Sequence, residues 1–486
     1  MTDTTKLRKA FPNTTVYKDQ GIVAMFMAAS IPAFLRDWIV TRKAESDGRI
    51  HDTEALRQYI YEIIPRRENL FELKESARSE GQTRRFLARI EVDLDTRHGE
   101  VSFAIPDLGL SKSETIIEDY VWERIKADLV KTAGGWGLVQ LGYHAPDDVY
   151  GRGCFTLLEY KNFCPYTVNL DVYREARKMF TPEEWLDVLL GAIDYNPEGY
   201  GDDWTRKHTM LTRLLPFIEP RVNLVELAPK GTGKSYLFGR VGKYGWLVSG
   251  GTLTRAKLFG DINGKAPGLI VSNDFVALDE IQSINFNDPS EMQGGLKAYM
   301  ESGEITVGRN RNVGGAGIIL LGNIQQEDMD ETRDMFRTLP NVFHESALLD
   351  RFHGFIRGRD IPRMSENMKV NGWALNTEYF TEIMHLLRQP GETLLYRHLA
   401  ESLVGYPTGA DTRDTEAVLR LCTAYLKLLF PHAVKPEDVD VGDFTRFCLR
   451  PAVRMRSVIR RQLQVIDPKE YGGKNMAAYT LRESAQ

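Results

Sequence analysis

The chain has 486 residues, more than a single hydrophobic core usually organises, so we expect two or three domains. Hydrophobic residues make up 42% and charged residues 27% of the chain, as in folded globular proteins, which excludes a largely disordered or fibrous class. The formal net charge is −5, so the chain lacks the basic excess of small nucleic-acid-binding domains, and any contact with DNA has to be local.

Signals for secretion, membranes and metal clusters are missing from the sequence. The first nine residues lead into no apolar segment, and the chain has no run of about 18 apolar residues, so we expect a cytoplasmic protein without a membrane partner. The four cysteines are widely spaced and form no Cys-x-x-Cys pair, which predicts neither a zinc site nor a disulfide framework.

The first third of the chain mixes the two kinds of periodicity. Helical spacing covers residues 30–62 and 113–132, and alternating patterns predict a β-hairpin over 86–105 and two strands at 136–143 and 154–160. We therefore expect residues 1–170 to form a mixed α/β region of the DNA-binding type. Its candidate DNA contacts are Arg84, Arg85 and Arg89, and a solvated charged face is the alternative.

The middle of the chain alternates helical and strand patterns, and the last part is helical. Thr181, Pro182 and Glu184 form a capping box that predicts a helix start. Between residues 204 and 325 the alternation predicts βαβ units with a parallel sheet. We therefore expect an α/β fold with a P-loop core over residues 171–365, followed by a helical lid and C-terminal tail over residues 366–486.

A phosphate-binding loop follows the first apolar strand of this core. The strand, residues 222–227, runs directly into Ala228, Pro229, Lys230, Gly231, Thr232, Gly233, Lys234 and Ser235. Small residues let backbone N–H groups close around phosphates, while Lys234 reaches the β and γ phosphates and Ser235 ligates Mg²⁺. This loop has the form of a Walker A motif, with Ala228 where the stricter pattern has glycine, and it predicts ATP and Mg²⁺ as cofactors.

A second apolar strand, beginning at Phe275, ends in two carboxylates and has the form of a Walker B motif. Asp279 would hold the Mg²⁺ and Glu280 would polarise the attacking water. A third apolar strand ends at Asn323, which we expect to lie beside the γ-phosphate as sensor 1. An ordinary turn residue is the alternative for Asn323.

Two further arginines are candidates for contacts with the nucleotide. Arg351 follows an apolar turn and is the expected arginine finger, supplied to the site of a neighbouring subunit, with a structural salt bridge as the alternative. In the basic amphipathic helix over residues 449–463, Arg456 is the expected sensor 2 and Arg454 the second choice. A solvated basic face is the alternative for both.

An insert between the Walker B and sensor 1 strands carries two more arginines. A helix that ends at Gly303 gives way to an alternating segment and a turn. Arg309 and Arg311 would lie on one face of a strand, where they could contact successive DNA phosphates, and an exposed hairpin without a ligand is the alternative. Together these motifs indicate an ATPase of the AAA+ type that works as a ring.

Several segments resemble the BrxL family, the Lon-like AAA+ ATPases of BREX phage-exclusion systems. The resemblance is dense over about residues 175–360 and is carried by residues 180–189, 213–219, 223–235, 249–251, 299–303 and 349–353. It implies binding of double-stranded DNA, assembly into a hexameric ring or stacked hexamers, and contact with other BREX components. Residues 300–307 and 348–352 also resemble the presensor hairpin and arginine finger of MCM helicases.

The chain departs from this family at its C-terminal end. Longer BrxL proteins continue into a Lon-protease-like domain, whereas this sequence stops at Gln486, so we do not expect protease activity. The predicted function is an ATP-hydrolysing ring protein that binds DNA and translocates on it or remodels it in anti-phage defence. The alternatives are an ATP-dependent protein unfoldase, which an aromatic pore loop would favour, and a DNA-binding scaffold with little turnover.

Overall fold

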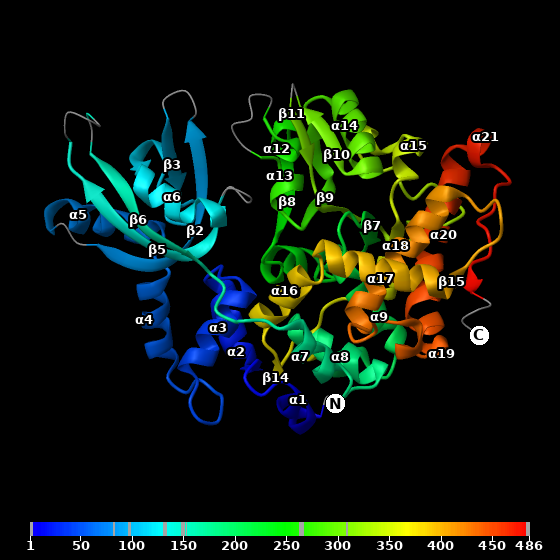
Figure 1. Cartoon of the computed structure of the whole chain (residues 1–486), viewed down its shortest axis with the longest axis horizontal. Coiled ribbons are helices and arrows are strands. Elements are labelled where there is room, and N and C mark those ends of the chain that lie inside the picture. The colour runs from blue at the N-terminus through cyan, green and yellow to red at the C-terminus, as the bar shows by residue number, and fades with distance from the viewer. Residues whose placement is uncertain are drawn as a thin grey trace.

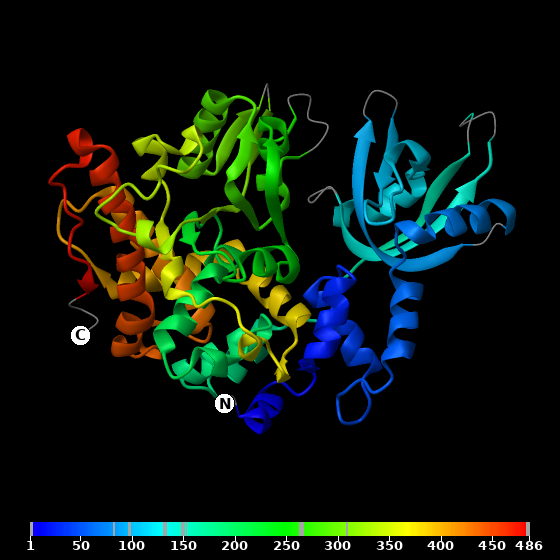
Figure 2. The ribbon, with the colours of Figure 1, turned by 180° about the vertical axis from the view of Figure 1, so that it is seen from behind.

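The computed structural model describes residues 3–80, 83–95, 99–129, 134–146, 151, 153–261, 267–307 and 310–482. Figure 1 shows a small body built around an antiparallel sheet beside a larger body built around a parallel sheet. The reverse view in Figure 2 shows the same separation, with the first helices of the chain at the foot of both bodies.

The small body is a five-stranded sheet with helices α5 (Leu70–Glu80) and α6 (Asp119–Leu129). Its strands are β2 (Arg84–Asp95), β3 (Glu100–Ala104), β4 (Thr115–Ile116), β5 (Gly134–His144) and β6 (Cys154–Asn162), in the order β3-β2-β5-β6-β4. All neighbours are antiparallel except β4 and β6. The predicted hairpin is present as β2 and β3, because alternate residues such as Ile90 and Phe103 are buried in its core.

The chain begins in the larger body, before the small body is made. Its first elements are α1 (Thr4–Ala10), β1 (Thr15–Lys18), α2 (Gln20–Ala28), α3 (Ala33–Lys43) and α4 (Thr53–Ile63). Strand β1 pairs antiparallel with β14 (Gly372–Leu375), more than 350 positions later in the chain. The helical pattern over residues 30–62 is therefore two helices, and the expected N-terminal region contributes its first strand to the other body.

The larger body is organised by a five-stranded sheet in which every neighbouring pair is parallel. Its strands are β7 (Leu224–Ala228), β8 (Gly245–Leu253), β9 (Phe275–Phe286), β12 (Gly317–Asn323) and β13 (Gly354–Arg357), in the order β13-β7-β12-β9-β8. Asn323 is in register with Ala228, so the carboxyl ends of β7 and β12 lie at one edge, and β9 joins them on the other side of β12. The sequence prediction of an α/β fold with a parallel sheet is confirmed.

Helices cover both faces of this sheet and continue into a helical C-terminal part. They are α7 (Leu170–Arg177), α8 (Pro182–Ala192), α9 (Trp204–Leu211), α10 (Leu215–Ile218), α11 (Lys234–Tyr236), α12 (Arg255–Phe259), α13 (Leu269–Ser272), α14 (Pro289–Ser302), α15 (Ser346–Leu349), α16 (Thr377–Leu386), α17 (Pro390–Leu403), α18 (Thr412–Leu429), α19 (Val441–Phe444), α20 (Arg450–Ile466) and α21 (Pro468–Tyr471). Ile319 and Ile356 pack on the face covered by α8 and α18, whereas Ile318 and Phe355 pack on the face covered by α14. Two short antiparallel pairs complete the body: the hairpin of β10 (Glu304–Val307) and β11 (Asn310–Val313), and the long-range pair of β15 (Val404–Gly405) with β16 (Thr480–Leu481).

Local sequence signals explain where two of these helices begin and end. Helix α8 starts with the predicted capping box, in which the Glu184 carboxylate accepts a hydrogen bond of 2.8 Å from the backbone N–H of Thr181. Helix α14 ends at Gly303, whose φ of +79° is a left-handed conformation that glycine adopts at little cost. In the part of the chain that the structure describes, no helix combines the length and the hydropathy needed to span a bilayer.

Candidate nucleotide site

The loop after β7 has the backbone conformation that a phosphate-binding loop requires. All five residues of β7 are buried, and the chain then turns through two glycines, Gly231 at φ +82° and Gly233 at φ +80°. At Gly233 a Cβ atom would also lie 2.4 Å from the hydroxyl of Tyr195, so a side chain is excluded there. The turn leads into α11 at Lys234 and directs backbone N–H groups at the space where an anion would bind.

Side chains from the neighbouring strands β9 and β12 meet those of the first two residues of α11 next to this loop. Lys234 Nζ donates a hydrogen bond of 3.2 Å to Asn323 Oδ1, at the end of β12. Ser235 Oγ donates one of 2.5 Å to Asp279 Oδ2, on β9. The structure thus brings the residues expected for Walker A, Walker B and sensor 1 into one cluster, although Lys234 and Asn323 are 89 positions apart in the sequence.

The oxygen donors of this cluster suit a magnesium ion. Mg²⁺ takes oxygen ligands, and in phosphoryl-transfer sites it is held by one or two protein groups together with phosphates and water. Ser235 Oγ and Asp279 Oδ2 are such a pair. Within the described residues no group of three or more His, Cys, Asp and Glu side chains is placed to hold a metal by protein ligands alone.

Glu280, next to Asp279, has an unusual backbone conformation. Its φ is +48°, one of four positive values at non-glycine residues in the described chain, and such a conformation costs about 1–3 kcal/mol. Its N–H donates a hydrogen bond of 2.9 Å to Asp279 Oδ1, while its side chain is exposed beside the buried Asp279. The strain lies at the residue that the motif assigns to water activation, which is where strain in a protein most often has a function.

Three positioning contacts of this site were missed by the motif analysis. Gln282, two residues after Glu280, donates through Nε2 to the backbone oxygen of Asn323 at 2.9 Å and accepts from its N–H at 3.4 Å. This exchange aligns the end of β12 with β9 and holds Asn323 facing Lys234. A polar residue at a regular interval after the Walker B carboxylates was the available signal.

The second missed contact is a buried ion pair that binds the backbone of the P-loop. Arg213 and Glu226 are both fully buried and form a two-pronged ion pair, with N–O distances of 2.9 and 2.5 Å. Arg213 also donates a hydrogen bond of 2.8 Å to the backbone oxygen of Thr232, inside the loop. A charged residue in the middle of the apolar strand β7 was the sequence signal, because a buried carboxylate needs a cationic partner.

A third contact links the nucleotide site to the first helices of the chain. The hydroxyl of Tyr236, the residue after Ser235, donates a hydrogen bond to Asp194. Asp194 is also paired with Arg36 of α3, at 2.6 and 2.9 Å, and with Lys18 of β1, at 2.8 Å. These cations lower the pKa of Asp194 against the effect of its burial, so the carboxylate is charged.

Arg351, the expected arginine finger, lies at the opposite end of the sheet. It precedes β13, whose first residue Gly354 pairs with Leu224 at the start of β7, whereas the P-loop leaves the far end of β7. The five residues of β7 separate these two edges by about 15 Å. Arg351 forms an ion pair of 3.0 Å with Glu301 of α14, so it is remote from the P-loop of its own chain.

The structure gives Arg456 a different role from the expected sensor 2. Its side chain has no exposed surface and pairs with Asp350 at 2.6 Å and Asp414 at 2.7 Å, and it donates to two backbone oxygens at 2.8 and 2.9 Å. Every N–H on its Nε and Nη1 and one on Nη2 faces a protein acceptor, so the group is a structural link between α20, α18 and the segment before β13. Arg454, the second choice, is 49% exposed and pairs with Asp360 at 3.0 Å.

Another arginine, Arg363, lies against the P-loop and was not singled out from the sequence. The backbone N–H of Met364 donates a hydrogen bond of 2.9 Å to the backbone oxygen of Gly231, so the segment that contains Arg363 and Met364 crosses the loop. A Cβ atom at Gly231 would lie 3.2 Å from Arg363 Nε. Arg363 is exposed and has no ion pair with any described residue, so it is a cation that a phosphate could attract.

The candidate DNA contacts do not form one surface. Arg309 lies outside the described residues. Arg311, on β11, is 69% exposed and pairs with Glu304 of the same hairpin. In the small body, Arg84 pairs with Glu72 at 3.0 Å and Arg85 with Glu159 at 2.7 Å, so carboxylates already compensate both charges.

Arg89 is placed by its contact with the larger body. Its guanidinium lies 4.3 Å from the ring centroid of Trp246, on β8, and burial lowers its pKa. The contact therefore joins the two bodies, which leaves Arg89 less available to DNA than Arg84 or Arg85. The sequence placed these three arginines together, and the structure separates their roles.

Known proteins resemble this chain over most of its length. A family model described as "Lon-like protease BrxL-like, ATPase domain" matches residues 155–477, and one described as "BREX system Lon protease-like protein BrxL N-terminal" matches residues 9–143. The Lon-like protease BrxL of Escherichia coli O9:H4 (strain HS) is 27% identical over 459 residues, which cover 92% of this chain and 63% of that protein. The Lon-like protease BrxL of Bacillus cereus (strain H3081.97) is 28% identical over 466 residues, covering 94% and 64%.

The chain spans somewhat less than two thirds of the length of these relatives, and the matched part includes the whole parallel sheet and the cluster at its edge. The match to the ATPase-domain model is consistent with the P-loop after β7. Since that model alone covers well over half of the chain, the protein belongs to the BrxL family.

Proposed function

We propose that the protein is an AAA+ ATPase that hydrolyses Mg²⁺-bound ATP at the carboxyl edge of its parallel sheet and uses this energy to translocate on DNA or remodel it in BREX anti-phage defence. The observation that carries the proposal is the cluster in which Lys234 meets Asn323 and Ser235 meets Asp279. The strand order, with the P-loop strand between β13 and β12, supports the AAA+ assignment because it puts sensor 1 directly beside the P-loop.

Each residue of the cluster has a distinct task in hydrolysis. The loop N–H groups and Lys234 would hold the phosphates, and Ser235 and Asp279 would hold Mg²⁺, whose charge would be available to neutralise the phosphate oxygens. Glu280 accepts a hydrogen bond from the attacking water and orients it. Asn323, fixed by Gln282, keeps Lys234 aligned.

The position of Arg351 supports assembly into a ring. It lies at the amino edge of the sheet, so it completes the site of a neighbouring subunit rather than its own. Before assembly Glu301 compensates its charge. In a closed ring every subunit would give a finger to one neighbour and receive one from the other, which is the geometry of a head-to-tail interface. A hexamer, single or stacked, is the form we propose.

The hairpin of β10 and β11 supports DNA rather than protein as the substrate. It is inserted between the strand that carries Asp279 and the strand that ends at Asn323, so it can report contact with a substrate to both. No aromatic residue lies between Glu304 and Val313, whereas Arg309 and Arg311 do. This composition favours phosphate contacts over the aromatic pore loop expected of an unfoldase.

The test is ATP turnover measured with and without double-stranded DNA. We expect the wild-type protein to hydrolyse ATP and DNA to stimulate it, while Glu280→Gln binds ATP and retains it. A matched control is Glu327→Gln, an exposed carboxylate on the loop after β12, which should keep wild-type turnover. Unchanged hydrolysis in Glu280→Gln would reject the site, and turnover stimulated by an unfolded protein but not by DNA would replace the DNA proposal with the unfoldase.

A further inference from the structure

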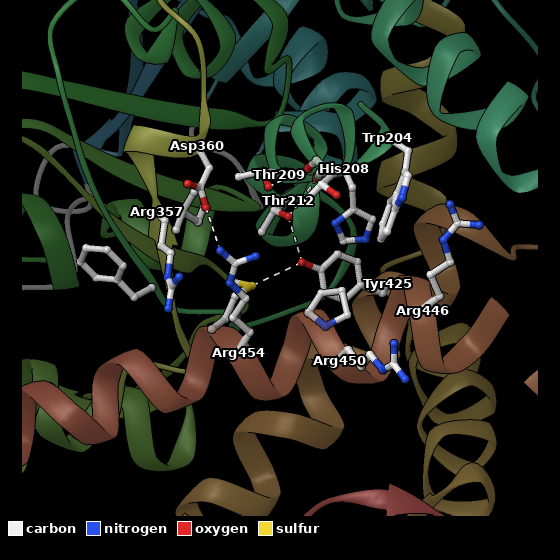
Figure 3. A pocket seen from close by; sticks show the side chains of 15 residues that line it. Trp204, His208, Thr209, Thr212, Arg357, Asp360, Tyr425, Arg446, Arg450 and Arg454 are labelled. Carbon is white, nitrogen blue, oxygen red and sulfur yellow. Dashed lines mark hydrogen bonds and ion pairs between the residues drawn. The ribbon is translucent and has the colours of Figure 1, made fainter. Parts of the chain in front are cut away.

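A second cavity lies on the outer side of β13, away from the cluster described above. It has a volume of about 340 Å³, opens to the surface and is lined mainly by residues of α9, β13, α18 and α20. Figure 3 shows the side chains that line it, with α20 along one side and the residues of α9 across from it. Pockets for small organic ligands range over about 300–1,000 Å³, so this one is large enough for a compact ligand.

The inner wall of the cavity is aromatic and carries hydroxyl groups. The rings of Trp204, His208 and Tyr425 line it, with those of His208 and Tyr425 only 4.8 Å apart. The hydroxyls of Thr212 and Tyr425 are hydrogen-bonded to each other at 2.9 Å (Figure 3). Burial lowers the pKa of His208 to about 4, so the imidazole is neutral at physiological pH and acts as an aromatic surface. His208 and Tyr425 are 4% and 1% exposed, so the half-buried Trp204 supplies most of the ring surface that could contact a flat heterocycle.

The rim of the cavity carries four arginines, Arg357, Arg446, Arg450 and Arg454. All but Arg450 pair with a carboxylate: Arg454 with Asp360 at 3.0 Å, Arg357 with Glu331 at 2.5 Å and Arg446 with Glu183 at 2.6 Å. Arg446 also lies 4.3 Å from the ring centroid of Trp204. Arg450 is exposed and its side chain has no ion pair or hydrogen bond with any described residue, so its charge is uncompensated. Burial and the neighbouring Arg454 lower the pKa of Arg357, as expected where positive charges gather.

The cavity is separate from the nucleotide site, although the two share one helical turn. None of its lining residues belongs to the P-loop, and Asp279, Glu280 and Asn323 are absent from its walls. Thr212 faces the cavity, whereas Arg213, the next residue, turns to Glu226 and the P-loop. The turn at Thr212 and Arg213 is therefore the wall between the two sites.

We propose that this cavity is a second nucleotide-binding site, which takes the base of a nucleoside phosphate against Trp204, His208 and Tyr425 and its phosphate on Arg450 and Arg454. Guanidinium groups bind phosphate oxygens in pairs, and aromatic rings bind the face of a base, so the lining matches both halves of that ligand. Asp360 would exchange its place at Arg454 for the phosphate. The site goes beyond hydrolysis, because none of these groups reaches the reacting phosphates.

Helix α20 connects the cavity to the segment that carries the expected arginine finger. Helix α20 carries Arg450 and Arg454 on its exposed face and Arg456 on its buried face. Arg456 holds Asp350, the residue before Arg351, at 2.6 Å. A ligand in the cavity would therefore contact the same helix that holds the segment before the finger.

Equilibrium dialysis with radiolabelled AMP and ATP tests the proposal on the full-length protein. Lys234→Ala removes the P-loop contact, so we expect the wild type to bind two nucleotides per chain and this variant to keep one. In the Lys234→Ala background, Arg450→Glu should weaken the remaining site at least tenfold. Arg57→Glu, an exposed arginine on α4, is the control and should leave it unchanged.

Comparing AMP with inorganic phosphate and with adenosine shows how much of the affinity comes from the phosphate and how much from the base. We expect AMP to bind more tightly than inorganic phosphate or adenosine alone, since each of these fills only half of the site. Binding of AMP no tighter than phosphate would overturn the proposal, as would loss of all nucleotide in Lys234→Ala. Weakened binding of the P-loop nucleotide in the single variant Arg450→Glu would also overturn it, because the cavity would then serve that nucleotide. If Lys234→Ala retained two nucleotides, that result would count against the P-loop assignment. The effect of Arg450→Glu on nucleotide affinity would still test whether one of the two binds in the cavity.

Discussion

The two sheets of this protein differ in how they use their charged residues. At the parallel sheet, Asp279 of β9 and Asn323 of β12 meet Lys234 and Ser235, which follow the loop after β7. In the antiparallel sheet, Arg84 and Arg85 are neighbours in sequence, yet each is paired with a different carboxylate, Glu72 and Glu159. Parallel strands end at the same edge, whereas consecutive residues of any strand point to opposite faces.

A motif is therefore only as informative as the topology that carries it. A polar residue at the carboxyl end of a parallel strand lies at the same edge of the sheet as the other strand ends. Its position in the sequence therefore predicts its position in space. A run of arginines on an antiparallel strand meets cross-strand partners that the run itself does not reveal. We therefore expect substitutions at the parallel edge to abolish chemistry and those in the antiparallel sheet to have small effects.

The largest effect is expected at the amino edge of the parallel sheet. Arg351→Ala should lower ATP turnover about 10³-fold and leave ATP affinity nearly unchanged, because a finger stabilises the transition state rather than the ground state. Mixing this variant with Lys234→Ala should restore part of the activity, since some interfaces would then join an intact finger to an intact P-loop. Absence of restoration in rings shown to be mixed would mean that Arg351 is only a partner of Glu301.

At the carboxyl edge, Glu280→Gln should lower turnover about 10²–10³-fold while ATP stays bound, because the amide cannot polarise water as a carboxylate does. Single-turnover kinetics and retention of labelled ATP after gel filtration measure the two effects. Glu280→Gly separates chemistry from strain. It relieves the positive φ and should be as inactive as the amide variant but no less stable to heat.

The helix α20 offers a comparison between two arginines that sequence patterns treat alike. Arg456→Met removes the cation that Asp350 and Asp414 share and the donor to two buried backbone oxygens, while Arg413 and Arg460 still pair with the two carboxylates. It should therefore destabilise the larger body by about 1–3 kcal/mol. Arg454→Met, at an exposed pair, should cost less than about 1 kcal/mol. Thermal unfolding followed by circular dichroism measures both. Equal melting temperatures for the two variants would contradict the structural role of Arg456.

The smallest effect concerns DNA and directly compares the two sheets. Neutralising Arg309 and Arg311 together should weaken binding to unrelated duplexes alike and reduce the slope of log affinity against log salt by about 2, one unit for each phosphate that an arginine no longer neutralises. Neutralising Arg84 and Arg85 should change that slope less, since carboxylates already compensate them. The reverse result would move the DNA-binding surface to the small body. Fluorescence anisotropy at several salt concentrations distinguishes these outcomes.

Much of the larger body could be predicted because its signals are local. The capping box at Thr181, the glycines of the P-loop and the apolar strands each specify their own conformation. The contacts that escaped prediction are between partners far apart in sequence. Arg36 and Asp194 are 158 positions apart, and no local pattern shows that a buried charge on one will meet its counterion on the other.

The same limit explains the misplaced roles. Arg456 and Arg454 lie two residues apart on one amphipathic helix, and only the position of Asp350 and Asp414 decides which is buried. Arg89 differs from Arg84 and Arg85 because Trp246, from the other body, lies over it. In both cases the sequence specified an arginine on a helix or strand, and the tertiary partner determined its role.

The pairing of β1 with β14 has a consequence for how the polypeptide is completed. The buried Lys18 donates to the backbone oxygen of Gly191 at 2.9 Å, across 173 positions, and the small body is formed by the chain between them. The chain leaves and re-enters at one place, where Trp38 and Phe163 pack edge to face with ring centroids 5.3 Å apart. The small body is thus an insertion with adjacent ends. The larger body is therefore discontinuous in sequence. During synthesis β1 cannot pair with β14 until nearly 360 further residues have been made.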